Sequence, residues 1–151
     1  MLFYAECKNQ RRIIKMLLGD VEVIHTLKSL ILRQIENLKE IVALVDGDPN
    51  TTQPPYLAKA KLLKEKSGVK LFTDERKNRV ILIYPNLEKW IYEIANKERV
   101  NLENYGFSKD LASFIHEAKA SPTQFQQIIH FLRKNKNKEL EILERFLKGN
   151  I

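Results

Sequence analysis

The segment Ile41–Val45 restricts the fold most strongly, because it holds five apolar residues without a polar break. A strand of this kind is expected where helices bury both faces of a sheet. It ends at the polar stretch Asp46-Gly47-Asp48, and the residues that follow are typical of a loop. The chain is therefore predicted to be an α/β protein with a small, mainly parallel sheet flanked by helices.

Short apolar runs alternate with helical patterns through the first half of the chain, as they do in β-α-β units. Residues 2–5 and 21–27 are predicted strands, and residues 9–18 and 27–38 are predicted helices. A third helix is predicted from Pro54 or Pro55 to about Lys66, stopped by Gly68. Two further strands are predicted at residues 69–73 and 80–84. They either pair as a hairpin, or only the second joins the main sheet.

The pattern is helical from Pro85 to the end of the sequence. We expect an α/β core over residues 1–96. A helical C-terminal extension over residues 97–151 is expected to pack on this core, so that the two form a single compact unit.

The composition limits the classes of protein and of partner. The 151 residues include 26 Lys and Arg against 19 Asp and Glu, and the net charge of +7 favours an anionic partner such as nucleic acid. The single cysteine, Cys7, excludes an intramolecular disulfide and any multi-cysteine metal site. No apolar run approaches the ~20 residues that span a bilayer, so no membrane partner and a cytoplasmic location are expected. A homo-oligomer is left open.

Acidic residues follow two of the predicted strands. Glu6 ends the first strand, and Asp46 and Asp48 follow the buried strand. Residues two apart in extended backbone project to the same side, and parallel strands place functional groups at their carboxyl ends. If the two strands are neighbours, three carboxylates converge and favour magnesium. The alternative is that Asp-Gly, a strong turn dipeptide, makes only a well-formed loop.

The order of these residues resembles the Toprim domain, the catalytic fold of topoisomerases, primases and overcoming-lysogenization-defect nucleases. Glu6 matches the family glutamate, and Asp46-x-Asp48 matches its Asp-x-Asp. Glu88-Lys89-Trp90 resembles the Glu-x-Trp helix start of small Toprim-like proteins linked to restriction and abortive infection. The resemblance covers roughly residues 2–96 and implies a Toprim-like or Rossmann-like sheet. The family usually has glycine after the glutamate, where this chain has Cys7.

The resemblance implies phosphodiester chemistry with Mg²⁺ or Mn²⁺ as cofactor. Asp46, Asp48 and Glu88 would hold the metal, and Glu6 would be the catalytic acid or base, or a shared ligand. For Glu88 the alternative is an acid favoured in the first turn of a helix by the macrodipole.

Basic residues follow Glu6 along the first predicted helix. Lys8, Arg11, Arg12 and Lys15 are candidate contacts for a nucleic-acid backbone. Arg11 and Lys15 are four residues apart and share a helix face. The alternative is a solvated face opposite the apolar stripe of that helix.

Three functions therefore follow from the sequence. The first is a magnesium-dependent enzyme that hydrolyses or transfers nucleic-acid phosphodiesters, a small nuclease of a defence or mobile-element system. The second is a non-catalytic module that keeps the fold and binds nucleic acid or a protein partner, which Cys7 in place of glycine favours. The third is a nucleotide-handling phosphotransfer enzyme that uses the same acids.

Overall fold

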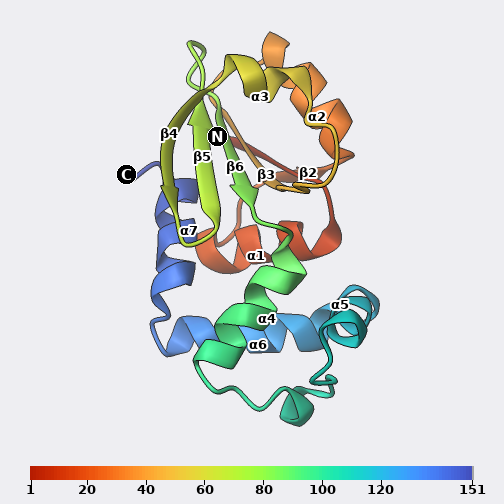
Figure 1. Cartoon of the computed structure of the whole chain (residues 1–151). Helices are drawn as coiled ribbons and strands as arrows, with labels where there is room; N and C mark the ends of the chain where they lie inside the picture. The colour runs from red at the N-terminus through yellow and green to blue at the C-terminus, as the bar shows by residue number, and fades with distance from the viewer. Residues whose placement is uncertain (151) are drawn as a thin grey trace.

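A six-stranded sheet forms the centre of the computed structural model, which describes residues 1–150 (Figure 1). The strands lie in the order β2-β1-β3-β6-β5-β4. Their bounds are β1 Leu2–Ala5, β2 Val23–His25, β3 Ile41–Asp46, β4 Lys61–Lys66, β5 Val69–Thr73 and β6 Arg79–Ile83. The protein is thus α/β, as predicted.

The sheet is mixed rather than purely parallel. Strands β2, β1, β3 and β6 pair in parallel, whereas β5 and β4 are added antiparallel beyond β6. Of the two alternatives considered for residues 69–73 and 80–84, the hairpin of β5 and β6 is confirmed. The alternative that only the second strand joins the main sheet was wrong, because β5 belongs to the same sheet.

Seven α-helices and two short 3₁₀ helices connect and follow the strands within residues 1–150. The α-helices are α1 Lys8–Leu18, α2 Lys28–Gln34, α3 Pro55–Lys59, α4 Leu87–Lys97, α5 Leu111–Ala120, α6 Pro122–Lys134 and α7 Lys138–Lys148. The 3₁₀ helices are η1 Ile35–Asn37 and η2 Leu102–Tyr105.

The prediction of one helix from Pro54 or Pro55 to Lys66 was wrong. Helix α3 ends at Lys59, and the next residues form the edge strand β4. Ser67 and Gly68 both have positive φ and make the turn into β5. Pairing with β5 decides the conformation here: Lys61–Lys66 is exposed throughout, Leu62 and Leu63 included, so no packing of a helix face competes with the strand.

The two faces of the sheet bury separate hydrophobic clusters. Val42 and Leu44 of β3 point into one cluster, and Ala43 and Val45 point into the other. The continuous apolar run is explained by this burial on both faces. Helices α2 and α3 cover one face, and α1 covers the other together with the helices that follow β6 (Figure 1).

The helices after residue 97 share the larger of the two clusters with the sheet. Phe114 of α5, Phe125 of α6 and Leu143 of α7 are fully or almost fully buried in it. The C-terminal segment is thus packed against the same apolar surface as α1. Within residues 1–150, no helix combines the length and the apolar character that a membrane crossing requires.

Candidate functional site

Glu6 and Asp46 meet at the carboxyl ends of the neighbouring parallel strands β1 and β3. The side-chain amide of Gln10 joins them: its Nε2 donates to Glu6 Oε1 at 3.3 Å and to Asp46 Oδ1 at 2.9 Å. Glu6 Oε1 also accepts a hydrogen bond from the backbone N–H of Asp46. The structure therefore brings together the two acids that end adjacent strands.

Gln10 is a site residue that the sequence reasoning missed. It is fully buried in the first turn of α1, and its Oε1 accepts from the backbone N–H of Glu6 at 2.9 Å. One amide thus contacts both the backbone and the carboxylate of Glu6. The spacing of four residues between Glu6 and Gln10 was the available signal, since it is the distance spanned by one helical turn.

Asp48 does not follow the expected extended path. Strand β3 ends at Asp46, and Asp48 has a φ of 45°, so the alternation of side chains along a strand no longer applies. Its Oδ2 lies 3.4 Å from Lys28 Nζ. The expectation that Asp46 and Asp48 project side by side from extended backbone was wrong, although the charge of Asp48 still acts on Asp46.

Lys28 holds the loop after β3 in place, and it is a second site residue that the sequence did not predict. Its ammonium donates to the carbonyl oxygen of Asp46 at 2.7 Å and to Gln53 Oε1 at 3.4 Å, besides its contact with Asp48. Lys28 begins α2, which follows β2, so only the tertiary fold brings it to this loop. No local sequence pattern links residue 28 to residue 46.

Gly47 allows this loop to pass beneath an aromatic ring. A Cβ atom at position 47 would lie 2.4 Å from Cδ1 of Tyr84, closer than real carbon atoms approach. The Gly47 N–H donates to the carbonyl oxygen of Ile83 at 2.7 Å and so continues the pairing of β3 with β6. The Asp-Gly-Asp sequence thus has a packing reason for its glycine.

Glu88 reaches the same edge of the sheet from the first turn of α4. Asn86 caps this helix by accepting from the Lys89 N–H at 2.8 Å, and the Leu87 N–H donates to Asp46 Oδ1 at 2.9 Å. Glu88 is only 2% exposed, and its Oε2 is buried without a hydrogen-bond partner. The helix start therefore places a buried acid close enough to Asp46 for its charge to act on that residue.

Burial and mutual repulsion perturb all three acids. Burial, followed by the charges of Glu6 and Glu88, raises the pKa of Asp46 to about 7. Burial also raises the pKa of Glu6 and that of Glu88. Clustered acids with raised pKa values are common at functional sites, and a bound cation relieves their repulsion.

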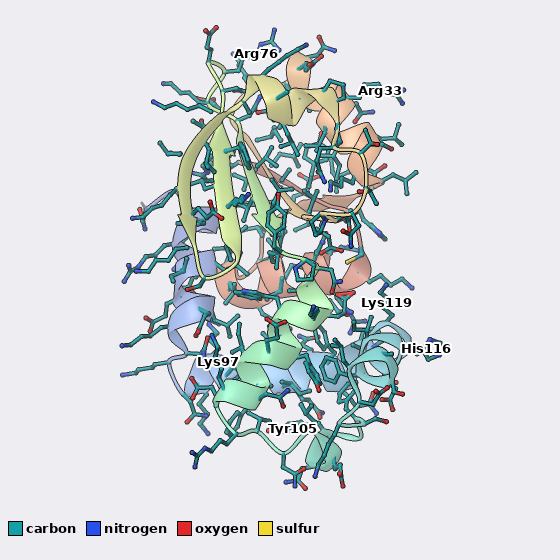
Figure 2. All side chains as sticks on the ribbon, in the orientation of Figure 1. Arg33, Arg76, Lys97, Tyr105, His116 and Lys119 are labelled. Atoms are coloured by element: carbon teal, nitrogen blue, oxygen red, sulfur yellow. The ribbon has the colours of Figure 1, made fainter. Side chains whose placement is uncertain are left out.

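A cavity of about 280 Å³ opens beside these acids between α1, β2, α4 and α5. Lys119, which is labelled in Figure 2, comes from α5 and lines this cavity. His25 Nε2 lies 3.2 Å from the carbonyl oxygen of Glu6. The residues that line the cavity are Glu6, Cys7, Lys8, Asn9, His25, Glu88 and Lys119.

The basic residues of α1 are divided between the cavity and the surface. Lys8 lines the cavity, whereas Arg11 and Lys15 are exposed along the helix. Arg12 Nη1 lies 3.5 Å from Thr123 Oγ1 of α6. Of the four predicted nucleic-acid contacts, Lys8 is therefore the one that the fold places at the acids.

Cys7 is the N-cap residue of α1, which begins at Lys8, one residue before the predicted start. Its side chain makes no capping hydrogen bond. Burial, together with the charges of the nearby acids, raises the pKa of the Cys7 thiol to about 12. The thiol is therefore protonated at neutral pH and is not a nucleophile.

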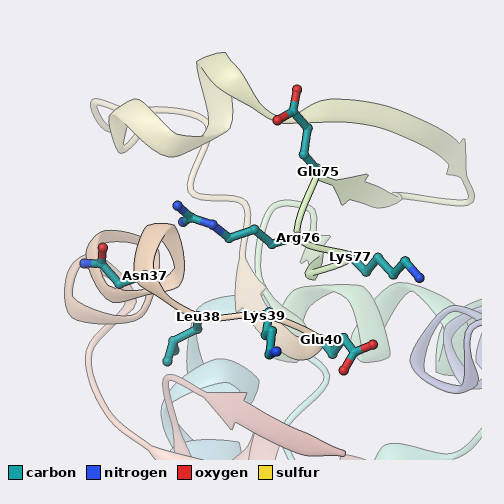
Figure 3. Close-up of a pocket in the computed structure, with 7 residues that line it drawn as sticks. All are labelled: Asn37, Leu38, Lys39, Glu40, Glu75, Arg76 and Lys77. Carbon is teal, nitrogen blue, oxygen red and sulfur yellow. The ribbon is translucent and has the colours of Figure 1, made fainter.

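A second cavity, of about 460 Å³, lies at the opposite end of the sheet, before β3 begins (Figure 3). It holds charged residues of both signs and none of the predicted site residues. The lining residues are Asn37, Leu38, Lys39, Glu40, Glu75, Arg76 and Lys77.

The donor chemistry at the carboxyl edge fits a hard divalent cation. The available donors are carboxylate oxygens, which Mg²⁺ prefers, and Glu88 Oε2 is a buried oxygen that lacks any other partner. As the side chains stand within residues 1–150, no three of His, Cys, Asp or Glu form a ready-made metal cluster. Comparisons with models of protein families, with curated proteins and with solved structures find no match to this chain.

Proposed function

We propose that the protein hydrolyses or transfers phosphodiesters of nucleic acid with the help of Mg²⁺ or Mn²⁺, on a Toprim-like fold. The observation that carries the proposal is the meeting of Glu6 and Asp46 at the ends of β1 and β3, with Glu88 buried beside them. A Toprim-like arrangement is supported by the parallel order β2-β1-β3-β6 and by the placement of these acids. A role in a defence or mobile-element system is part of the same proposal.

In this proposal Asp46, Asp48 and Glu88 hold the cation, which stabilises negative charge developing on the phosphate and the leaving oxygen. Asp48 would exchange its contact with Lys28 for this role. Its carboxylate is free to do so, because 39% of the side chain is exposed and the contact with Lys28 is 3.4 Å long.

Glu6 is the proton carrier in the proposed reaction. Its raised pKa brings protonation closer to neutral pH, which is what a general acid or base requires. The hydrogen bonds from Gln10 and from the backbone of Asp46 hold one oxygen in place. Lys8, on the edge of the cavity, receives the phosphate backbone, and Arg11, Arg12 and Lys15 extend the basic surface along α1.

A second candidate is a non-catalytic module that binds nucleic acid or a protein partner. It is favoured by the hydrogen bonds that already occupy the acids: Asp46 Oδ1 accepts from Gln10 and Leu87, and Glu6 Oε1 accepts from Gln10 and Asp46. Carboxylates satisfied in this way also serve to join β1, β3 and α4 without any cation.

Cleavage of labelled DNA and RNA in Mg²⁺ or Mn²⁺ distinguishes the two candidates. We expect Asp46→Asn to lower the rate about 100-fold or more, as loss of a group that stabilises the transition state does. The control Asp20→Asn changes an exposed aspartate after α1 and should leave the rate unchanged. Equal cleavage by all three proteins would locate the activity elsewhere. Tight binding of nucleic acid without metal-dependent cleavage would favour the non-catalytic module.

A further inference from the structure

Asn9 and Glu88 line the cavity between α1, α4 and α5, and each has a buried oxygen without a hydrogen-bond partner. These oxygens are Oε2 of Glu88 and Oδ1 of Asn9, a residue that is only 5% exposed. Both atoms accept hydrogen bonds and neither donates one in its usual state. Burial of an unpaired acceptor costs about 1–3 kcal/mol, and more for a charged group. The two oxygens therefore call for a hydrogen-bond donor or a cation as their partner.

The orientation of the Asn9 amide is set by the C-terminal helices. Its Nδ2 donates to the carbonyl oxygen of Ala118 in α5 at 3.1 Å. Ala118 is itself fully buried, which holds this end of α5 against α1. Reversing the amide would place Oδ1 against the Ala118 carbonyl, so Oδ1 must be the atom left without a protein partner.

The charges around the cavity also suit a cation that binds to these two oxygens. Glu6 and Glu88 contribute carboxylates. The charge of Lys119 already acts on Glu88, but Lys119 and Lys8 are exposed, so a bound cation can displace their side chains into solvent. Amide and carboxylate oxygens are the ligands of hard divalent cations.

We propose that Asn9 Oδ1 and Glu88 Oε2 bind one divalent cation, Mg²⁺ or Mn²⁺, and that α5 positions Asn9 for this contact. The site deepens the proposed function and rests on it for the choice of a divalent cation. It also gives the C-terminal helices a role, since the backbone of α5 fixes the direction of a metal ligand.

Titration of the full-length protein with Mn²⁺, in the absence of nucleic acid, tests this site. Asn9→Ala and Glu88→Gln should each weaken Mn²⁺ binding by about tenfold or more, given the losses of 10–100-fold seen for groups that only support metal ligands. The matched controls Asn96→Ala and Glu93→Gln change exposed residues of α4 and should stay within about twofold of wild type. The double variant Asn9→Ala/Glu88→Gln should bind Mn²⁺ at least as weakly as the weaker single variant, because it removes both ligands of one ion.

Asn9→Asp separates ligation from support of the fold. An aspartate cannot donate to the Ala118 carbonyl, so a purely structural role for Asn9 would make this variant bind Mn²⁺ as weakly as Asn9→Ala. Ligation instead predicts a clearly higher affinity than that of Asn9→Ala, because the aspartate keeps an oxygen that can bind the ion. The rise in melting temperature caused by Mn²⁺, measured for each variant against its own metal-free state, gives the same comparison if a variant is less stable.

The outcomes also separate this site from the proposed function. Wild-type Mn²⁺ affinity in Asn9→Ala or in Glu88→Gln would overturn the site even if Mg²⁺-dependent cleavage is observed. The expected losses of affinity without any cleavage of nucleic acid would support the site and refute the proposed hydrolysis.

Discussion

Asp46 makes the fold less stable at neutral pH than an asparagine in the same position would. Burial and the charges of Glu6 and Glu88 raise its pKa from an ordinary 3.8 to about 7. The folded state therefore keeps a proton that the unfolded chain releases, and the free energy of unfolding falls as the pH rises from about 4 to about 7. Asp46→Asn removes this loss, because an amide does not ionise.

The size of the effect follows from the two pKa values. Each unit of pKa corresponds to about 1.4 kcal/mol. The free energy of unfolding is therefore lowered by about 4 kcal/mol above pH 7 and by roughly 1–2 kcal/mol at pH 5. The asparagine Oδ1 can still accept from the Leu87 N–H and from Gln10, so the local hydrogen bonds are kept. We therefore expect Asp46→Asn to be more stable than wild type, by an amount that grows by up to about 3 kcal/mol between pH 5 and pH 8.

Urea unfolding in the presence of a metal chelator at pH 5 and pH 8 measures this difference. Asp20→Asn controls for the substitution itself and should change the free energy of unfolding by no more than about 0.5 kcal/mol at either pH. A constant difference between Asp46→Asn and wild type at the two pH values would refute the reasoning. So would an asparagine variant that is less stable at pH 8.

Three further outcomes are expected. Gly47→Ala should lower the free energy of unfolding by about 1–3 kcal/mol in urea titrations, because the new methyl group overlaps the ring of Tyr84. Lys28→Met should lower the free energy of unfolding by about 1–3 kcal/mol in the same assay. The substitution leaves the carbonyl oxygen of Asp46 and the carboxylate of Asp48 without the ammonium group that donates to them. Cys7 should react with a thiol reagent at pH 8 much more slowly in the native protein than in urea, because its pKa is about 12 in the folded state. Equal labelling rates would contradict this burial.

The sequence was sufficient to predict the part of the site that depends on parallel strand ends. Glu6 and Asp46 follow apolar runs, and parallel neighbours align their carboxyl ends, so the two acids were expected to meet if β1 and β3 are adjacent. The helix start before Glu88 was also visible, since Asn86 is a strong capping residue.

The remaining contacts depend on features that no local pattern encodes. The direction of Asp48 is set by a left-handed backbone angle after β3, and its partner Lys28 arrives from the helix that follows another strand. Strand β4 was mistaken for a continuation of α3 because its pairing partner, β5, lies beyond the turn at Gly68. In both cases a tertiary contact overrides local propensity.

The hydrogen bond between Asn9 and Ala118 joins residues 109 positions apart in the chain. During synthesis Glu6 and Asp46 leave the ribosome well before α5 exists. At about 5–20 residues per second, α5 follows them after a delay on the order of ten seconds. In that interval the nascent chain carries its acidic residues without the helix that orients Asn9. The order of translation therefore delays completion of the cavity until α5 has been made.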